Sequence, residues 1–270
     1  NKLVYSVISN PYDKKTEILK YGFGSVSPSG GQYDTKYIKR AESIPSDVIN
    51  TTSIETSSSD YEIRAWYDAN EDTIFYYTEQ KKIYLPVDSW GMFLNFSKLR
   101  SLDLSDFDSS YVTNLSSMFS QCSELEEVNL SSFDTRNVTN MENMFRFSRK
   151  IKYLNLSNFN TEKVTNMEEM FENMHFLIEL DISNFNTKNV KNMNRMFATY
   201  AGTVDVLEKI YVNSDFDTSN LINSVQIFDE RKKLRGGKGS FLAYPRDADK
   251  TWLRIDDPDN GRPGYFTKKA

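Results

Sequence analysis

The chain has 270 residues, of which 39% are hydrophobic, and carries a formal net charge of −5 with an isoelectric point near 5.2. This acidic balance argues against a nucleic-acid-binding protein, which needs a basic face. No apolar run approaches the roughly 18 residues of a membrane-spanning helix, and a single cysteine, Cys122, excludes an internal disulfide.

The first 60 residues carry no motif that we can assign. Residues 3–8 and 17–21 read as strands, and the Gly- and Ser-rich residues 22–34 are expected to form a loop. Residues 51–60, TTSIETSSSD, indicate a flexible linker or loop. We therefore interpret residues 1–60 as an N-terminal β-rich segment, which is either part of a cap or a separate small domain.

Residues 61–91 are expected to form an N-terminal cap. Three short β-rich runs, YEIRAWY, TIFYYT and KKIYL, follow one another here, and DANED marks a turn between the first two. A stack of repeats exposes core and strand edges at each end, so a cap of this kind is needed.

A repeat of 26 residues fills residues 92–233. Met-Phe pairs recur at this spacing, at Met92-Phe93, Met118-Phe119, Met144-Phe145, Met170-Phe171 and Met196-Phe197. Three further registers keep the same period, and they hold Phe107, Phe133, Phe159 and Phe185, then Val112, Val138, Val164 and Val190, then Asn114, Asn140, Asn166 and Asn192. Near residue 205 about four extra residues interrupt the period, and the last unit is atypical, as the end of a repeat array should be.

Each unit reads as a strand, a turn and a short helix. In the second unit, Leu125, Val128 and Leu130 follow the pattern L-x-x-L-x-L of leucine-rich repeat strands. We expect Phe133 and its equivalents to stack into an aromatic spine. The stretch TNME at residues 139–142 matches a capping box, which predicts that a helix begins there and turns Met141, Met144 and Phe145 toward the core. The predicted fold is therefore an α/β leucine-rich repeat solenoid, with a parallel strand plus a short helix per repeat and β-rich caps at both ends.

Residues 234–270 are expected to form a C-terminal β-hairpin cap. The glycines of GGKG at 236–239 predict a turn that ends the helix of the last unit, and TWLRID and GYFT read as two strands joined by DPDNGRPG. In this interpretation four apolar side chains face the stack, those of Trp252, Ile255, Tyr265 and Phe266.

The units LDLSDFDSSYVTNLSSMFSQCSEL and VNLSSFDTRNVTNMENMF resemble those of the BspA-like bacterial leucine-rich repeat surface proteins, of the DUF285 type. The flanking stretches IRAWYDANEDTIFYYTEQKKIYL and LRGGKGSFLAYPRDADKTWLRIDDPDNGRPGYFT are similar too, so the resemblance covers about residues 61–268. It implies a secreted or wall-associated bacterial protein, with adhesive or host-interaction roles in some members and no catalytic residues. The chain begins at Asn1 and ends in FTKKA without a wall-anchoring motif, and we expect a mature or excised fragment.

The residues themselves do not indicate an enzyme, a cofactor or a metal site. His175 is the only histidine and is interpreted as a loop residue, and Cys122 as a semi-buried small side chain. GGKG lacks the spacing of a phosphate-binding loop. The acidic runs Asp103, Asp106, Asp108 and Asp256, Asp257, Asp259 do not follow the twelve-residue pattern of a calcium loop, so we read them as solvated turn acids.

The candidate site is instead a surface, formed by the outward-facing residues of the repeat strands. Solenoids use such extended concave faces for binding, and tyrosines are enriched at binding hot spots. The predicted face contains Asp103, Glu127, Asn129, Tyr153, Asn155, Glu179, Asp181 and Tyr211. We expect a bacterial surface or secreted module that binds a protein or glycan of a host or neighbouring cell, without nucleic acid or membrane insertion. The alternative is a structural spacer that presents another part of a larger protein.

Overall fold

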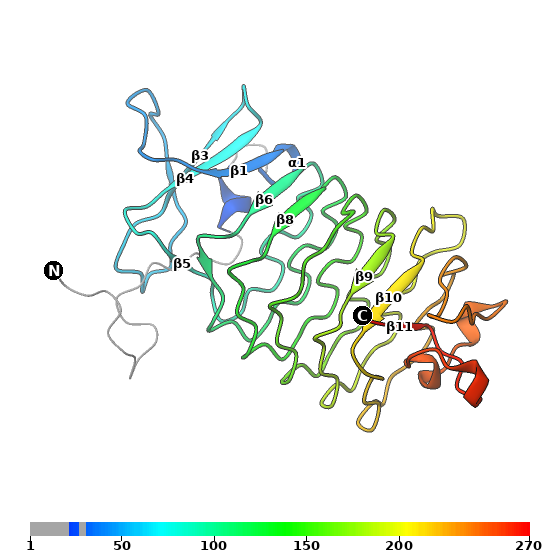
Figure 1. Ribbon diagram of the computed structural model, residues 1–270. Helices are drawn as coiled ribbons and strands as arrows, with labels where there is room; N and C mark the ends of the chain where they lie inside the picture. The colour runs from blue at the N-terminus through cyan, green and yellow to red at the C-terminus, as the bar shows by residue number, and fades with distance from the viewer. Residues whose placement is uncertain (1–21, 27–30) are drawn as a thin grey trace.

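The computed structural model describes residues 22–26 and 31–270, and this part of the chain is rich in strands and poor in helices (Figure 1). The strands are β1 (Tyr37–Arg40), β2 (Thr52–Ser53), β3 (Arg64–Asp68), β4 (Thr73–Tyr77), β5 (Ile83–Tyr84), β6 (Ser101–Asp103), β7 (Phe107–Asp108), β8 (Glu127–Asn129), β9 (Glu179–Asp181), β10 (Lys209–Val212) and β11 (Phe266–Lys268). The helical segments are one short α-helix, α1 (Gly31–Asp34), and four 3₁₀ turns, η1 (Phe23–Ser25), η2 (Pro245–Asp247), η3 (Lys250–Trp252) and η4 (Pro258–Asn260). No helix among the described residues is long and apolar enough to cross a membrane.

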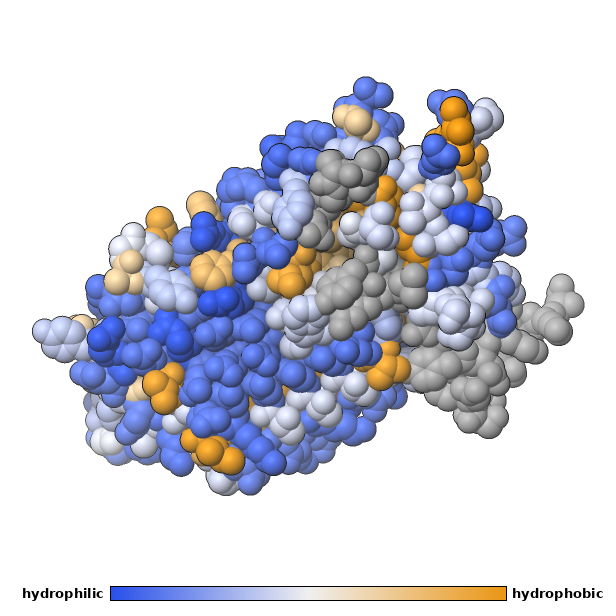
Figure 2. Space-filling view, turned by 180° about the vertical axis from the view of Figure 1, so that it is seen from behind, coloured by the Kyte–Doolittle hydropathy of each residue, from blue (hydrophilic) through white to orange (hydrophobic). Residues whose placement is uncertain are grey.

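The strands form three sheets. Their orders are β2-β3-β4-β1-β6-β8, β11-β10-β9 and β5-β7. Pairing within β2-β3-β4 is antiparallel, whereas every other strand pair is parallel. Figure 1 shows β6, β8, β9 and β10 side by side in chain order along one side of the molecule. The opposite view in Figure 2 is mainly hydrophilic, with hydrophobic residues in small separate groups.

Successive 26-residue segments lie side by side as parallel coils. Strand β6 pairs with β8 so that Leu102 lies opposite Val128, a separation of 26 residues. A second series of parallel bridges runs through the Asn register, from Asp88 through Asn114, Asn140, Asn166 and Asn192 to Asn223. Every coil is thus bridged to the next through the Asn register, and the coils of β6 and β8 and of β9 and β10 also pair along their strands. These bridges explain why the chain repeats the same residues at the same spacing.

The predicted helix in each repeat is wrong for the described coils. Met141, Asn143, Phe145 and Phe147 donate their backbone N–H groups to carbonyl oxygens of the following coil, at 2.8–3.0 Å. Asn143 and Phe147 have positive φ angles of 56° and 61°, which break any helix and turn these N–H groups outward. The residues form consecutive turns, because an adjacent copy of the same segment offers acceptors to every second N–H group.

The predicted capping box is wrong as well, for the same reason. Asn140, rather than Thr139, caps the local turn, because its Oδ1 accepts a 2.9 Å hydrogen bond from the N–H of Glu142. Thr139 instead donates its hydroxyl to the carbonyl of Thr113 in the preceding coil, at 3.3 Å. Asn114, Asn166 and Asn192 make the same bond to the N–H group two residues further on.

A continuous stack of phenylalanine rings passes through the core. Its members are the phenylalanines of the Met-Phe pairs and the equivalent residue of the last coil, namely Phe93, Phe119, Phe145, Phe171, Phe197 and Phe228, with neighbouring ring centroids 5.3–6.0 Å apart. We predicted the spine in the other register, where Phe133 and Phe159 do stack at 6.4 Å but Phe185 tilts against Phe171. The main spine therefore lies in the segment where inter-coil hydrogen bonds hold equivalent residues in register.

Buried hydroxyl groups also link the coils. Thr135 donates its Oγ1 to the carbonyl of Asn160 at 2.8 Å and accepts the N–H of the same residue at 2.8 Å. Thr161 makes the equivalent pair of bonds with Asn186. Both hydroxyl side chains are almost fully buried, so the paired bonds satisfy groups that would otherwise destabilise the core.

Part of the N-terminal segment belongs to the cap sheet. Strand β1 lies between β4 and β6 and is parallel to both, and β2 falls within the predicted linker at residues 51–60. The linker prediction is therefore wrong in part, since Ile54 is fully buried. In the predicted loop at 22–34, η1 carries Phe23, whose ring stacks on Phe93 at 5.9 Å. The strands predicted at 3–8 and 17–21 lie outside the described residues.

The C-terminal segment closes the stack, but not as the predicted β-hairpin. Strand β11 pairs in parallel with β10, and the stretch read as the other strand of the hairpin begins in η3. Phe266 and Tyr265 are fully buried against the last coil, with the Tyr265 ring 4.7 Å from that of Phe228. Trp252 and Ile255 also pack against the core, as predicted for all four residues. The segment reaches back to the sheet because an edge strand needs a partner along its backbone.

Candidate binding pocket on the sheet face

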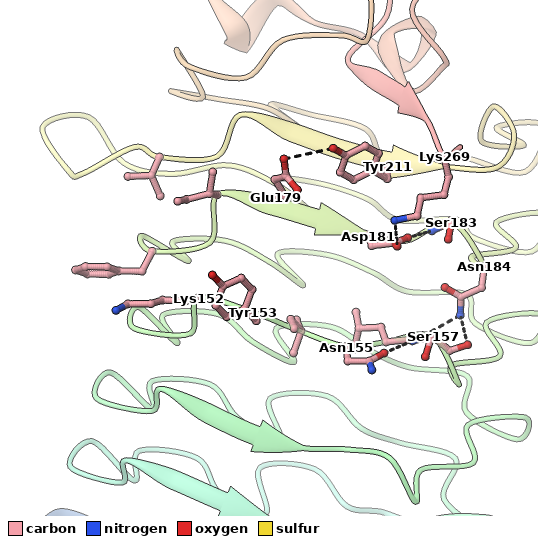
Figure 3. Close-up of a pocket in the computed structure, with 15 residues that line it drawn as sticks. Lys152, Tyr153, Asn155, Ser157, Glu179, Asp181, Ser183, Asn184, Tyr211 and Lys269 are labelled. Carbon is pink, nitrogen blue, oxygen red and sulfur yellow. Dashed lines mark hydrogen bonds and ion pairs between the residues drawn. The ribbon is translucent and has the colours of Figure 1, made fainter.

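A pocket of about 970 Å³ opens on the strand side of the stack (Figure 3). Its walls come from three neighbouring coils and from the segment after β11. The lining residues are Lys152, Tyr153, Leu154, Asn155, Leu156, Ser157, Phe176, Ile178, Glu179, Asp181, Ser183, Asn184, Val206, Tyr211 and Lys269. Residues 152–157, which form no assigned strand, line the pocket consecutively, whereas alternation along β9 and β10 turns Glu179, Asp181 and Tyr211 toward it.

Five of the eight predicted face residues line this pocket. Tyr153 and Asn155 come from one coil, Glu179 and Asp181 from β9, and Tyr211 from β10. Tyr153 is 89% exposed. The parallel pairing of β9 with β10 sets Asp181 opposite Tyr211.

The other three predicted residues lie on the same side but outside the pocket. Asp103 is on β6, and Glu127 and Asn129 are on β8. All three are exposed. The structure thus divides the predicted face into a pocket around β9 and an outer part around β6 and β8.

Four equivalent residues of the predicted face, one from each of four coils, also hold the local turn in place, which the sequence pattern did not reveal. Asp103, Asn129, Asn155 and Asp181 each accept a 3.0 Å hydrogen bond from the backbone N–H two residues further on. This bond closes the turn after the strand, as Asn and Asp side chains commonly do. These four side chains therefore lie at the surface with one oxygen already accepting a hydrogen bond from the backbone.

Charge in the pocket is partly balanced within the chain. Lys269 donates to Asp181 at 2.9 Å and lies 4.9 Å from the centre of the Tyr211 ring. Burial works against ionisation of Asp181, but the hydrogen bonds from Ser183 and Lys269 outweigh it and lower the pKa of the carboxyl group. The same bond to Asp181 raises the pKa of Lys269. This ion pair ties the C-terminal segment to β9.

Glu179 lines the pocket beside Tyr211. Its Oε1 accepts a 3.3 Å hydrogen bond from the hydroxyl of Tyr211. Glu179 forms no ion pair with a lysine or arginine of the described residues. Lys152, which also lines the pocket, forms no ion pair with an acid of these residues either. In Figure 3 the side chain of Lys152 extends away from the Glu179–Tyr211 pair. Glu179 therefore offers a negative charge to a ligand at one place in the pocket, and Lys152 offers a positive charge at another.

Sequence reasoning missed the apolar part of the lining and Lys269. Phe176, Ile178 and Val206 stand near the start of their strands, where Leu-x-x-Leu-x-Leu patterning predicts no particular side chain. A comparison of equivalent positions would have singled out Phe176 and Ile178, since the coil before them has Lys150 and Lys152 there. No pattern along the chain reveals that Lys269 returns to β9, because the pairing of β11 with β10 brings it there.

The residues considered for catalysis lie elsewhere and do not assemble a reactive site. Cys122 is fully buried, not semi-buried as predicted, and burial raises the pKa of its thiol to about 12. His175 is half-buried, and burial together with nearby Arg149 lowers the pKa of its imidazole. Within residues 22–26 and 31–270, no group of three or more His, Cys, Asp or Glu side chains could hold a metal ion. The Gly236–Gly239 turn does not end a helix but wraps the Asp256 carboxylate, which accepts N–H groups of Lys238 and Ser240.

The chain matches a known family model. A family model described as "Mycoplasma protein of unknown function, DUF285" matches residues 87–210 and, in a second overlapping match, residues 147–241. Together the two matches span more than half of the chain and include the pocket residues of all three coils. Neither the curated proteins nor the solved structures contain a match.

Proposed function

Because the chain belongs to the DUF285 family, whose function is unknown, we propose from its surface chemistry that it is a non-enzymatic binding module. The proposed ligand is a protein or glycan of a host or neighbouring cell, held on the sheet face. The observation that carries this proposal is the convergence of Tyr153, Glu179 and Tyr211, from three separate coils, on one pocket. Pockets that combine aromatic side chains with a few polar groups are the usual form of binding sites.

The fold interpretation that accompanies this function is a leucine-rich repeat solenoid on a bacterial surface or in secreted form. The parallel stacking of 26-residue coils supports the solenoid, with turns in place of helices. A solenoid suits binding because its coils present a long row of side chains on a rigid frame. The extracellular location is part of the proposal and follows from the resemblance to surface proteins.

A screen of the purified chain against protein and glycan arrays tests the binding function. The proposal predicts saturable binding of at least one array component, and competition by an excess of the unlabelled chain. The spacer alternative predicts no saturable binding to either array. Detection of hydrolase or transferase turnover would contradict both interpretations.

A further inference from the structure

The apolar side chains of the pocket occupy positions that are charged in other coils. The position of Phe176 is held by Lys98, Glu124 and Lys150 in the three preceding coils, and the position of Ile178 by Arg100, Glu126 and Lys152. In the following coil, Val206 lies in the register of Phe176, because Leu180 pairs with Ile210. Tyr153 is the aromatic member of its register, in which the other coils have Ser101, Glu127, Glu179 and Lys209.

Charged residues at the Phe176 position form ion pairs that join neighbouring parts of the stack. Glu124 and Lys150 form an ion pair across adjacent coils at 2.5 Å, and Lys98 pairs with Asp34. Phe176 replaces such a paired residue, and Ile178 replaces a charged residue, with side chains that remain 44% and 52% exposed. Neighbouring coils therefore show that this position does not require an apolar side chain for folding. A cluster of exposed apolar residues at such positions marks a contact surface.

The two ends of the pocket differ in chemistry. Ile178 and Val206 lie at the end where the strands begin, whereas Ser157 and Asn184 lie beyond the strand ends. Ser183 follows Glu179 by four residues, just beyond the end of β9, and four extended residues span about 13 Å. A ligand that spans the pocket along the strands thus covers about four extended residues, apolar at one end and polar at the other.

We propose that the pocket binds an extended segment of a partner polypeptide, with a bulky apolar side chain against Phe176, Ile178 and Val206 and a basic side chain paired with Glu179. This inference rests on the proposed binding function and specifies its ligand class. Charge complementarity supports the basic side chain, since Asp181 is already paired with Lys269 and Glu179 has no ion-pair partner within the described residues.

The lining favours a polypeptide over a saccharide. Ile178 and Val206 have no hydrogen-bonding groups and no aromatic face, so hydroxyl groups buried against them would lose their partners in water. A leucine or phenylalanine side chain gains from the same contact. At the polar end, the amide nitrogen of Asn155 makes no hydrogen bond within the described part of the chain, because only its Oδ1 serves the turn. That group can donate to a peptide carbonyl.

The test uses a displayed library of random linear peptides selected on the full chain, followed by titration of synthetic versions of the enriched peptides. We expect enriched sequences to place a bulky apolar residue beside Arg or Lys, and Ile178→Lys to weaken their binding by at least about tenfold. Glu126→Lys, at the equivalent position outside the pocket, should leave the affinity unchanged. Both lysine variants should keep the melting temperature, since Lys152 already occupies this register.

A second variant separates charge from shape. Glu179→Gln is expected to reduce the preference for an Arg-containing peptide over its Gln analogue by about fivefold or more, with little change for the Gln analogue. Enriched peptides whose binding is unaffected by both pocket variants would overturn the inference. Glycan binding that Ile178→Lys abolishes, without peptide binding, would also overturn it while leaving the proposed binding function intact. Absence of binding to peptides, proteins and glycans would overturn both.

Discussion

Arg146 donates its Nε–H to the carboxylate of Glu172 at 2.7 Å, and Glu172 lies 26 residues further on, in the next coil. Arg195 donates to the other oxygen of the same carboxylate at 2.6 Å. The Glu172 side chain is completely buried, whereas both arginines are partly exposed. The carboxylate therefore depends on its two partners for solvation, and together they fasten coils at the turn side of the stack.

This geometry predicts a large loss of stability when Glu172 becomes neutral. Glu172→Gln should lower the free energy of unfolding by about 1–3 kcal/mol, because the buried group loses its charged hydrogen bonds to both arginines. Arg146 keeps only Glu169 as a counter-charge, and Arg195 keeps only Asp229. Chemical denaturation measures the effect. Glu162→Gln is the matched control, since Glu162 pairs with Lys188 across the same 26-residue step but in solvent, and should have no measurable effect. Equal losses in the two variants would show that burial of the pair does not matter.

The turns that replace the predicted helix give a second prediction. Ser117 has a φ of 56°, in the left-handed region, whereas Ser120 keeps a negative φ. Ser117→Gly should hold or raise the unfolding free energy, because glycine removes a strain of roughly 1 kcal/mol. Ser120→Gly should lower it by about 0.5–1 kcal/mol through added entropy of the unfolded chain. Thermal unfolding of the two variants compares these effects, and an equal loss at both positions would contradict the turn geometry.

The C-terminal closure gives a third prediction. A Cβ atom on Gly236 would collide with the carbonyl oxygen of Gly264 and the carboxylate of Asp256, whereas a Cβ on Gly237 would lie 3.3 Å from Thr267 Cα. Gly236→Ala is expected to destabilise the chain by about 1–3 kcal/mol. Gly237→Ala should cost less than about 0.5 kcal/mol because the residue is exposed. A Gly236→Ala variant as stable as the wild type would mean that β11 is not held as described.

The Glu142 carboxyl group leads to a pH-dependent prediction. Burial and the nearby Glu168 raise its pKa, so the folded state binds a proton more tightly than the unfolded state does. This contribution to stability is present at low pH and is lost as the pH rises from the usual value near 4.5 through the raised pKa. Glu142→Gln should therefore increase the melting temperature at pH 7, with a gain of roughly a few tenths of a kcal/mol after solvent screening.

The gain from Glu142→Gln should disappear near pH 4, where the wild-type carboxyl group is protonated in the folded state. Glu127→Gln, on the exposed face of β8, provides the control and should change the melting temperature little at either pH. A Glu142→Gln variant that is less stable than the wild type at pH 7 would contradict the assigned repulsion.

The sequence contained enough information for the repeat, the parallel order of the coils and most of the core. Apolar residues that recur with the period, such as Phe145 and Val138, could be predicted as buried, because equivalent residues of adjacent coils pack against one another. The helices were wrongly predicted because the pattern of Met141, Met144 and Phe145 fits a helical face equally well. Their N–H groups can bond either within a helix of the same repeat or to carbonyl groups of the adjacent coil. The stacking of coils decides between the two, and a single repeat carries no information about stacking.

The candidate site was predicted in part. Strand alternation placed Tyr153 and Glu179 on the surface, and both line the pocket. It did not distinguish them from Glu127, which lies on the same side but outside the pocket. It also gave no sign that Asn155 and Asp181 close turns, because the same polar residues suit a binding face and a turn. The position of Lys269 depends on how the C-terminal segment returns to the sheet.

The most direct test of the account is a titration of any ligand found by the array screen against Tyr153→Ala, Glu179→Ala and Glu127→Ala. We predict that the first two variants weaken binding by at least about tenfold with unchanged melting temperatures, and that Glu127→Ala binds as the wild type does. Wild-type affinity in both Tyr153→Ala and Glu179→Ala would contradict the assignment of the binding site to this pocket.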